Sequence, residues 1–520
     1  MSSYLYELPT TGAISFSEFC LDQTASYVVE LAETTEARAN LRVALKEFKR
    51  AEDSERDYLK LVKVSVPFQV SGSMPETNTG NPKVLDEYIP KLYGITACVN
   101  SSDLALKAEP IFSWRTTLSS NIFNSSPRLS IPSLPTELAF TLLTYGFALS
   151  NLSRSVVVSL GTYETERAIS DADRKAKDER LQFAVTLLCK AAGVFEYIAT
   201  DLLSQWDLAK ERALAGGMSC PRPPDLTREV LKGISKMALA DAQTLAIRKL
   251  LSKAAFENTI SPGPPLPKSH PSPSLAAKLH LDCASLYSSA RSLAKTPGAS
   301  RPNLTSITSS SKSKFKLNIG KKDKSKDGAS EGNMPREEAG EDVSPELRRY
   351  LADEIALHNA LAHKWLGVDA GENGSTLEGG RAVGFLSWAK KELEELKHGG
   401  LGHSIGLSDR ERVVREARRA RVQAELESVN TFLKGYKRMN DSLAFQPIPP
   451  QSDLQASIPT GRSVVTIKPY GQPTPTFGPG SVEYARKQTE ALELLDESDT
   501  NTSQAESGSR TDYAGAGAYY

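Results

Sequence analysis

The chain has 520 residues and equal numbers of basic and acidic side chains, 63 of each, so its formal net charge is zero. This balance gives no overall electrostatic reason to expect a nucleic acid as a partner, and any charged binding surface must be local. The five cysteines are odd in number and include no CxxC pair. A disulfide framework is therefore not expected, and the reducing cytoplasm is the predicted compartment.

The first residues, MSSYLYELPTTG, lack a basic segment followed by an apolar core, so we predict no secretory signal. The longest mostly apolar run, Leu138 to Leu149, is too short to span a bilayer. Contact with membranes is therefore expected to be peripheral or to occur through a partner.

Apolar residues at helical spacing dominate the pattern and predict a nearly all-α protein. The clearest stripe runs from Leu181 to Trp206, and a second runs from Leu275 to Leu293. Ser344 before Pro345 is a typical helix start. The only strand signal is an alternation of apolar and polar residues near 60–70, which is consistent with a small β-hairpin. The other predicted helices are 17–31, 34–64, 136–168, 227–256, 345–366, 381–398 and 409–442.

Two low-complexity segments interrupt the helices. Residues 257–273 are proline-rich, and residues 296–343 are rich in Ser, Lys, Gly and Glu. Such segments bury too little apolar surface to offset the entropy of ordering, so we predict disordered insertions within one domain of residues 1–455. Residues 456–520 are rich in Pro, Ser and Thr and predict a flexible tail.

Catalytic motifs are not evident. The histidine pairs His358/His363 and His398/His403 are five residues apart, whereas helical zinc sites place two histidines four apart with a glutamate between them. The glycines of 398–406 match neither phosphate-binding pattern. We therefore predict no enzyme, no catalytic residue, no metal and no cofactor. The alternative, a hydrolase with an unrecognised site, requires His, Asp and Cys side chains that converge in a pocket.

Four segments resemble Bro domains, the helical modules of the Alix family, and occur in the family's order. The core of the first is KAAGVFEYI, Lys190–Ile198, within the long central helix. The others are Leu239–Lys249 (LADAQTLAIRK), Leu275–Ala290 (LAAKLHLDCASLYSSA) and Lys437–Pro450 (KRMNDSLAFQPIPP). The resemblance implies a boomerang-shaped helical solenoid with a tetratricopeptide-like core.

Two further strings, Glu7–Cys20 and Leu92–Ser119, are similar to family members of fungal ambient-pH signalling. That likeness implies an adaptor that binds the C-terminal helix of an ESCRT-III subunit and supports proteolytic activation of a pH-responsive transcription factor. It also implies a cytoplasmic protein that is recruited to the plasma membrane cortex or to endosomes, with other pH-signalling components as further partners and no nucleic acid. The alternative is a general endosomal-sorting (multivesicular body) adaptor of the same family without a dedicated pH role.

The resemblance also places the ESCRT-III-binding patch on this chain, at Ala246, Ile247, Leu275 and Leu279. The position of Ala246 is aromatic in the animal members of the family, so the anchor there is smaller. Helix-in-groove recognition needs such apolar anchors on adjacent helices. However, Leu275 and Leu279 also fit the apolar stripe that continues to Leu293, so packing in the core is an equally open interpretation.

A run of lysines in the second insertion has two interpretations. It is either a contact for anionic lipid or a solvated loop. The residues are Lys312, Lys314, Lys316, Lys321, Lys322, Lys324 and Lys326.

Overall fold

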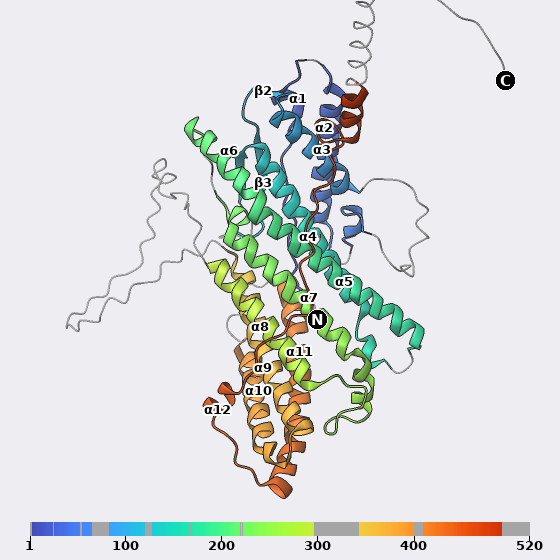
Figure 1. Ribbon diagram of the computed structural model, residues 1–520, viewed down its shortest axis with the longest axis vertical. Helices are drawn as coiled ribbons and strands as arrows, with labels where there is room; N and C mark the ends of the chain where they lie inside the picture. The colour runs from blue at the N-terminus through green and yellow to red at the C-terminus, as the bar shows by residue number, and fades with distance from the viewer. Residues whose placement is uncertain are drawn as a thin grey trace, which may run out of the picture.

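A computed structural model describes residues 3–23, 25–52, 55–64, 83–119, 127–166, 169–218, 220, 222–295, 343–399 and 409–490. It shows an elongated body of long helices (Figure 1), as the all-α prediction requires. The long helices are α2 (Val28–Arg50), α3 (Val84–Asn100), α4 (Leu134–Leu160), α5 (Asp171–Tyr197), α6 (Leu203–Ala215), α7 (Arg228–Ile260), α8 (Pro273–Lys295), α9 (Pro345–Asn373), α10 (Gly379–Gly399) and α11 (Asp409–Met439). Short helices are α1 (Phe16–Phe19) and α12 (Gln451–Ala456).

Strands occur as two small antiparallel pairs near the N-terminal end of the body. Strand β1 (Cys20–Leu21) pairs with β2 (Ala105–Leu106). Strand β3 (Ile111–Arg115) pairs with β4 (Arg128–Pro132), with Phe112 opposite Ile131. No strand covers residues 60–64, which instead contain the end of a short 3₁₀ turn, Tyr58–Lys60, and residues 65–70 lie outside the described part. The strand prediction for residues 60–64 is therefore wrong, and both strand pairs seen among the described residues lie elsewhere.

Most of the long helices match their predicted ranges, whereas the N-terminal ones do not. The predicted helices 17–31 and 34–64 are replaced by α1 and a single α2, and α3 was not predicted. Two residues in the left-handed or an irregular conformation, Ala25 and Tyr27, interrupt the first predicted range before α2 begins. The predicted cap of α9 is confirmed, because the Ser344 hydroxyl accepts a hydrogen bond from the backbone N–H of Leu347 at 3.3 Å.

The core consists of two large clusters of buried apolar side chains and a smaller third one. The first cluster extends from the N-terminus to the start of α9, includes Phe477, and surrounds α4, which is buried along most of its length. Within it lies a buried ion pair between Arg38 and Glu137, 2.8 Å apart, and the Glu137 carboxylate also accepts hydrogen bonds from Trp114 and Tyr88. Pairing of this kind compensates the cost of removing both charges from water. The second cluster is formed by α8 to α12, in the distal half.

Helices α5 and α6 are joined by one π-helical turn, Ile198–Leu202, into a continuous rod from residue 171 to residue 215. By length and composition this rod could cross a membrane, but 72% of its most apolar window is buried inside the protein. This burial is the signature of a core helix of a folded domain.

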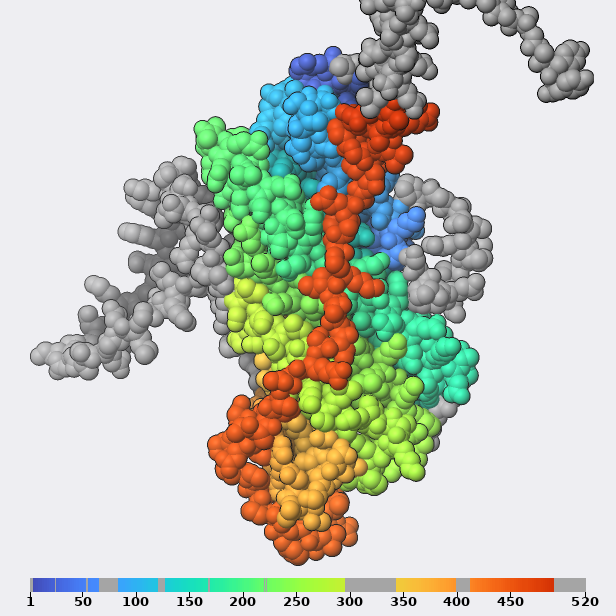
Figure 2. Space-filling model, viewed as in Figure 1, coloured from blue at the N-terminus to red at the C-terminus, as the bar shows by residue number. Residues whose placement is uncertain are grey.

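The segment after α12 differs from the predicted tail. Residues 457–478, which we call the arm, lie in extended conformation along the body and cross it from the distal half toward the N-terminal half (Figure 2). The backbone N–H of Arg462 donates to the Lys278 carbonyl at 3.0 Å, and that of Lys468 donates to the Cys189 carbonyl at 3.1 Å. The packed chain thus continues beyond residue 455, because specific backbone hydrogen bonds hold a proline-rich segment that has no helical period.

Of the two predicted insertions, the structure describes the first and not the second. Residues 261–272 form an irregular loop after α7, but the loop packs on the distal half: Leu266 joins the second cluster and its N–H donates to Glu372 at 3.1 Å. Residues 296–342, including the lysines 312–326, lie outside the described residues.

Candidate partner-binding face of α7 and α8

Helices α7 and α8 form an antiparallel pair in the middle of the body, and the predicted patch lies on this pair. Their contact is fixed by Gln243, whose side chain is fully buried. Its amide Nε2 donates to the Leu279 carbonyl and to the Asp282 carboxylate, both at 2.9 Å. A buried amide needs all of these partners, so Gln243 sets the register of the two helices.

The same glutamine also holds the arm. Its Oε1 accepts hydrogen bonds from the Ser463 hydroxyl at 3.2 Å and from the Val464 N–H at 3.1 Å. Gly461 passes so close to the backbone of Asp282 that a side chain there would clash at 2.7 Å. The arm therefore crosses the pair beside Gln243, and we call the surface that α7 and α8 expose next to this crossing the α7–α8 face.

The structure separates the four predicted residues into two groups. Ile247 and Leu279 are each only 1% exposed and belong to the first core cluster. Ala246 and Leu275 are half-buried, and Leu275 packs against the edge of that cluster. Ala246 lies one turn after Gln243 on α7, and Leu275 lies one turn before Leu279 on α8, so the antiparallel pairing brings them to the same level.

This placement favours core packing for Leu279 and Ile247 and leaves Ala246 and Leu275 as the members that reach the surface. Leu250 on α7 is also half-buried and lies one turn beyond Ala246. Together these three give the α7–α8 face a small apolar strip, with the half-buried Lys249 and Lys278 next to it. Their role in binding stays a prediction.

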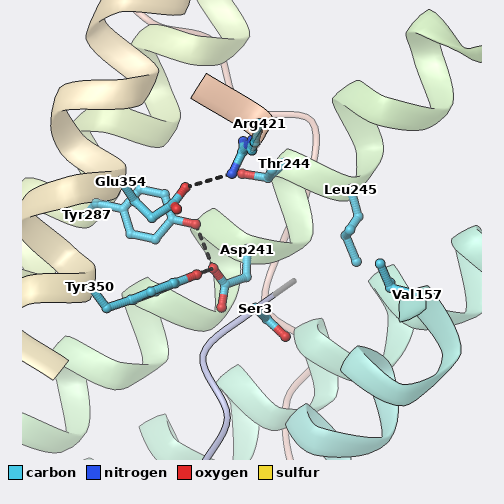
Figure 3. Close-up of a pocket in the computed structure, with 9 residues that line it drawn as sticks. All are labelled: Ser3, Val157, Asp241, Thr244, Leu245, Tyr287, Tyr350, Glu354 and Arg421. Atoms are coloured by element: carbon cyan, nitrogen blue, oxygen red, sulfur yellow. Dashed lines mark hydrogen bonds and ion pairs between the residues drawn. The ribbon is translucent and has the colours of Figure 1, made fainter. Parts of the chain in front are cut away.

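Beneath the face lies a buried polar cluster that joins the two halves of the body (Figure 3). The hydroxyls of Tyr287 and Tyr350 donate to one oxygen of Asp241, at 2.5 and 2.6 Å. Close by, Arg421 of α11 donates to Glu354 of α9 at 3.2 Å. Burial raises the pKa of Asp241 to about 7, although the two tyrosine hydroxyls oppose the shift by stabilising the carboxylate.

Two histidines and a cysteine extend this cluster. One imidazole nitrogen of His358 lies 3.1 Å from the Thr244 hydroxyl, and the other lies 2.9 Å from His280. Burial lowers the pKa of His280 to about 3 and lowers that of His358 as well, so both rings are neutral at physiological pH. Burial also raises the pKa of the Cys283 thiol, which lies 3.8 Å from Thr244.

This convergence of His, Asp and Cys is the arrangement that the hydrolase alternative requires, so its chemistry matters. A nucleophilic cysteine needs a lowered pKa and access to substrate, and Cys283 has a raised pKa and is fully buried. The cavity beside Asp241 leaves room for little more than one water molecule. The cluster is therefore suited to fixing the contact between α7, α8, α9 and α11, and it offers no space for a substrate.

The resemblance of Lys437–Pro450 implied that the last long helix gives way to an extended arm, but sequence reasoning predicted a flexible tail after residue 455 and missed the residues that hold the arm. The available signal was a period of two inside the proline-rich tail, since Val465 and Ile467 are half-buried against the body while Val464 and Thr466 are exposed. Nothing in the local sequence distinguishes Gln243 from a surface glutamine, because its partners come from α8 and from the arm, both distant in the chain.

The chain is similar to a known protein family and to curated fungal proteins. A family model for the BRO1-like domain matches residues 76–491, which include the arm. The pH-response regulator protein palC of Cryptococcus neoformans var. neoformans serotype D is 36% identical over an alignment of 541 positions that covers 100% of both chains. The palC protein of Emericella nidulans is 26% identical and covers 99% of this chain and 98% of its own.

Solved structures share the fold at low sequence identity. The ALIX BRO1 CHMP4C complex superimposes with a TM-score of 0.52 at 15% identity, covering 92% of this chain and 98% of the other. ALIX in complex with the SIVmac239 PYKEVTEDL late domain gives 0.53 at 14% identity, covering 97% and 56%.

Proposed function

The chain belongs to the BRO1-like domain family, and we propose that it is an adaptor that binds an ESCRT-III subunit in alkaline ambient-pH signalling. The full-length identity with the Cryptococcus palC regulator carries the pH-signalling part of this proposal. The adaptor part is supported by the family membership and by the shared fold with a BRO1 domain solved as a complex with CHMP4C. The buried His/Asp/Cys cluster, which has no room for a substrate, favours an adaptor over an enzyme.

The proposed contact is the α7–α8 face. An amphipathic helix of the partner would lay its apolar side chains on Ala246 and Leu275, while Ile247 and Leu279 support these two from below. Since the residue at 246 is small, the partner has to contribute the larger side chain at that point. An apolar strip of only three half-buried residues suits a small, transient regulatory interaction.

Recruitment to a membrane completes the proposed role. We expect a cytoplasmic protein that reaches the plasma membrane cortex or endosomes through ESCRT-III, with other pH-signalling components as further partners, and that supports activation of the pH-responsive transcription factor by proteolysis. The lysine loop of residues 312–326 remains a predicted anionic-lipid contact outside the described residues.

The test is calorimetric titration of the full chain with synthetic C-terminal helices of the fungal ESCRT-III subunits. Leu275→Asp should weaken binding at least about tenfold, because a charge on the apolar strip opposes burial of the partner's helix. Ser285→Asp is the matched control, since it adds the same charge at an exposed position of α8. Unchanged affinity of a folded Leu275→Asp variant would remove the contact from this face.

A genetic experiment separates the pH role from general endosomal sorting. A deletion strain should fail to grow at alkaline pH and fail to process the transcription factor, and Leu275→Asp should not rescue it whereas Ser285→Asp should. Normal growth and processing in the deletion strain would favour the general sorting adaptor.

A further inference from the structure

The distal end of the body carries a group of large apolar side chains that point to solvent. They come from the α9–α10 connection, from the last residue of α11 and from the segment after it. We call these side chains, together with the turn that holds them, the distal tip. They are Leu377 (71% exposed), Met439 (48%), Leu443 (74%), Phe445 (73%) and Ile448 (55%). Exposed apolar side chains scattered singly need no explanation, but a cluster of this size indicates a binding surface.

The backbone of the distal tip is built to hold these side chains outward. Asn440 is buried, donates from Nδ2 to the Gln446 carbonyl at 2.9 Å and accepts from the Gln446 N–H at 3.1 Å. Between these two residues the N–H of Phe445 donates to the Asn440 carbonyl at 2.7 Å. The turn is thus closed by three hydrogen bonds around the five residues 441–445, and its apolar residues are excluded from the interior.

Phe445 itself adopts a left-handed backbone conformation, with φ at 50°. A bulky L-residue in this region is strained, and such strain persists where the surrounding structure imposes it. The neighbouring Gly380 permits the arrangement, because any side chain at that position would collide with the Pro447 carbonyl. A strained turn that displays an exposed phenylalanine is difficult to explain by stability alone.

The charges around the distal tip identify its partner. Lys434, Lys437 and Arg438, in the last turns of α11, are all exposed, and Asp441 is the exposed acid within the turn. Arg381 on α10 lies on the same end and pairs with Glu378. Apolar residues at the apex with cations behind them match a membrane interface, where apolar side chains enter the acyl boundary and cations meet anionic headgroups.

The shape of this end favours a lipid surface over a protein helix. The distal tip projects at the end of the long axis (Figures 1 and 2). A projecting turn suits a soft planar surface, whereas a protein partner would have to supply a pocket for it. We propose that the distal tip inserts Leu443 and Phe445 into the headgroup region of an anionic lipid membrane.

This membrane contact is separate from the α7–α8 face and does not depend on the proposed ESCRT-III interaction. The face lies in the middle of the body and the distal tip at its end (Figure 1), so a partner on the face leaves the tip free.

The test uses a fluorescent label placed at the distal tip of the full chain. All five native cysteines are buried, so Leu443→Cys can be labelled selectively with an environment-sensitive nitrobenzoxadiazole group. Vesicles of phosphatidylcholine with about 30% phosphatidylserine should shift its emission to the blue and raise its intensity, as for charge-assisted interfacial insertion. Val482→Cys, which is 79% exposed on the segment after the arm, is the matched control and should show no shift.

Vesicle co-sedimentation measures the strength of the contact. Phe445→Ser combined with Leu443→Ser should lower the partition coefficient about tenfold or more, because two apolar side chains no longer leave water. Val482→Ser with Leu208→Ser removes equally exposed apolar groups elsewhere and should leave it unchanged. Replacement of Lys437 and Arg438 by Glu should also weaken binding and abolish its salt dependence at this site.

Three outcomes would overturn the proposal. The first is an unshifted label at position 443 while the protein still sediments with vesicles, which would assign membrane binding to another region. The second is equal partition of the Ser variant and the native chain. The third is a native dimer that the Ser variant converts to a monomer, measured by sedimentation velocity, which would identify the distal tip as an interface between two copies.

Discussion

The α7–α8 face and the distal tip both contain large apolar side chains, yet the two regions expose them to different extents. Beneath the face, Leu279 is 1% exposed and its carbonyl accepts a hydrogen bond from Gln243, which also holds the arm. At the tip, Leu443 is 74% exposed and a closed turn keeps it outward. The difference teaches that an apolar residue becomes a binding residue only where the backbone prevents it from entering the core.

The largest effect that follows from this contrast concerns two equivalent substitutions. Leu279→Asp should lower the free energy of unfolding by about 4 kcal/mol or more, because it places an unpaired charge in the core and removes a packed side chain. Leu443→Asp should change it by no more than about 0.5 kcal/mol, as expected of an exposed position. Urea denaturation of both variants and of the native chain measures these changes in the free energy of unfolding. Comparable losses in the two would contradict the assignment of one residue to the core and the other to the surface.

A smaller effect concerns the polar cluster beneath the face, which has no counterpart at the tip. The pKa of Asp241 is raised to about 7 from an ordinary value of 3.8, so between these values the folded protein binds a proton that the unfolded chain does not. The free energy of unfolding contributed by this group therefore falls as the pH rises from about 4 to about 7, on the order of 1.4 kcal/mol for each unit of raised pKa.

Asp241→Asn keeps an acceptor for Tyr287 and Tyr350 but removes the titration. Relative to the native chain, the variant should gain stability with rising pH over this window, as followed by urea denaturation at pH 5 to 8. Asp225, whose pKa burial raises to about 6, is retained in both proteins and cancels in the comparison. A constant difference between native chain and variant at all pH values would show that Asp241 does not titrate there.

The smallest expected effect on the free energy of unfolding concerns Phe445 in the distal tip. Phe445→Gly relieves the left-handed backbone strain, so the free energy of unfolding should stay equal or rise by up to about 1 kcal/mol. At the same time vesicle binding should weaken, since the apolar ring is gone. A loss of more than about 1 kcal/mol in thermal or urea unfolding would mean that the ring contributes to folding and that its exposure has no functional origin.

Much of the fold follows from sequence because its long helices are strongly periodic. The stripe from Leu181 to Trp206 and the cap at Ser344 predicted their helices correctly, since local spacing and local hydrogen bonds determine both. The N-terminal region was not predicted correctly from sequence. Its elements α1, α2 and the two strand pairs depend on long-range contacts such as the Arg38–Glu137 ion pair, which joins residues 99 positions apart. Propensity alone cannot report such long-range choices.

The candidate site was predicted only in part for the same reason. The likeness of LADAQTLAIRK and LAAKLHLDCASLYSSA to known helices placed the predicted patch on α7 and α8, which the structure shows to be adjacent, but the spacing of Leu275 and Leu279 fits core and surface equally well. Only the register set by Gln243 decides that Leu279 turns inward and Leu275 stays at the edge. The exposure of Phe445 depends on its left-handed backbone conformation. Phenylalanine disfavours that conformation, so the sequence gives no signal for it.

The arm also competes with any partner that binds to the same groups of α7 and α8. Because residues 457–478 are tethered to the body at α12, they meet Gln243 at an effective concentration in the millimolar range, a typical value for short linkers. A partner that needs the same hydrogen-bonding groups would have to outcompete this intramolecular ligand, whereas one that lands on Ala246 and Leu275 alone would not. Gly193, whose lack of a side chain lets the Lys468 carbonyl approach α5, is a second point at which the arm is held against the body.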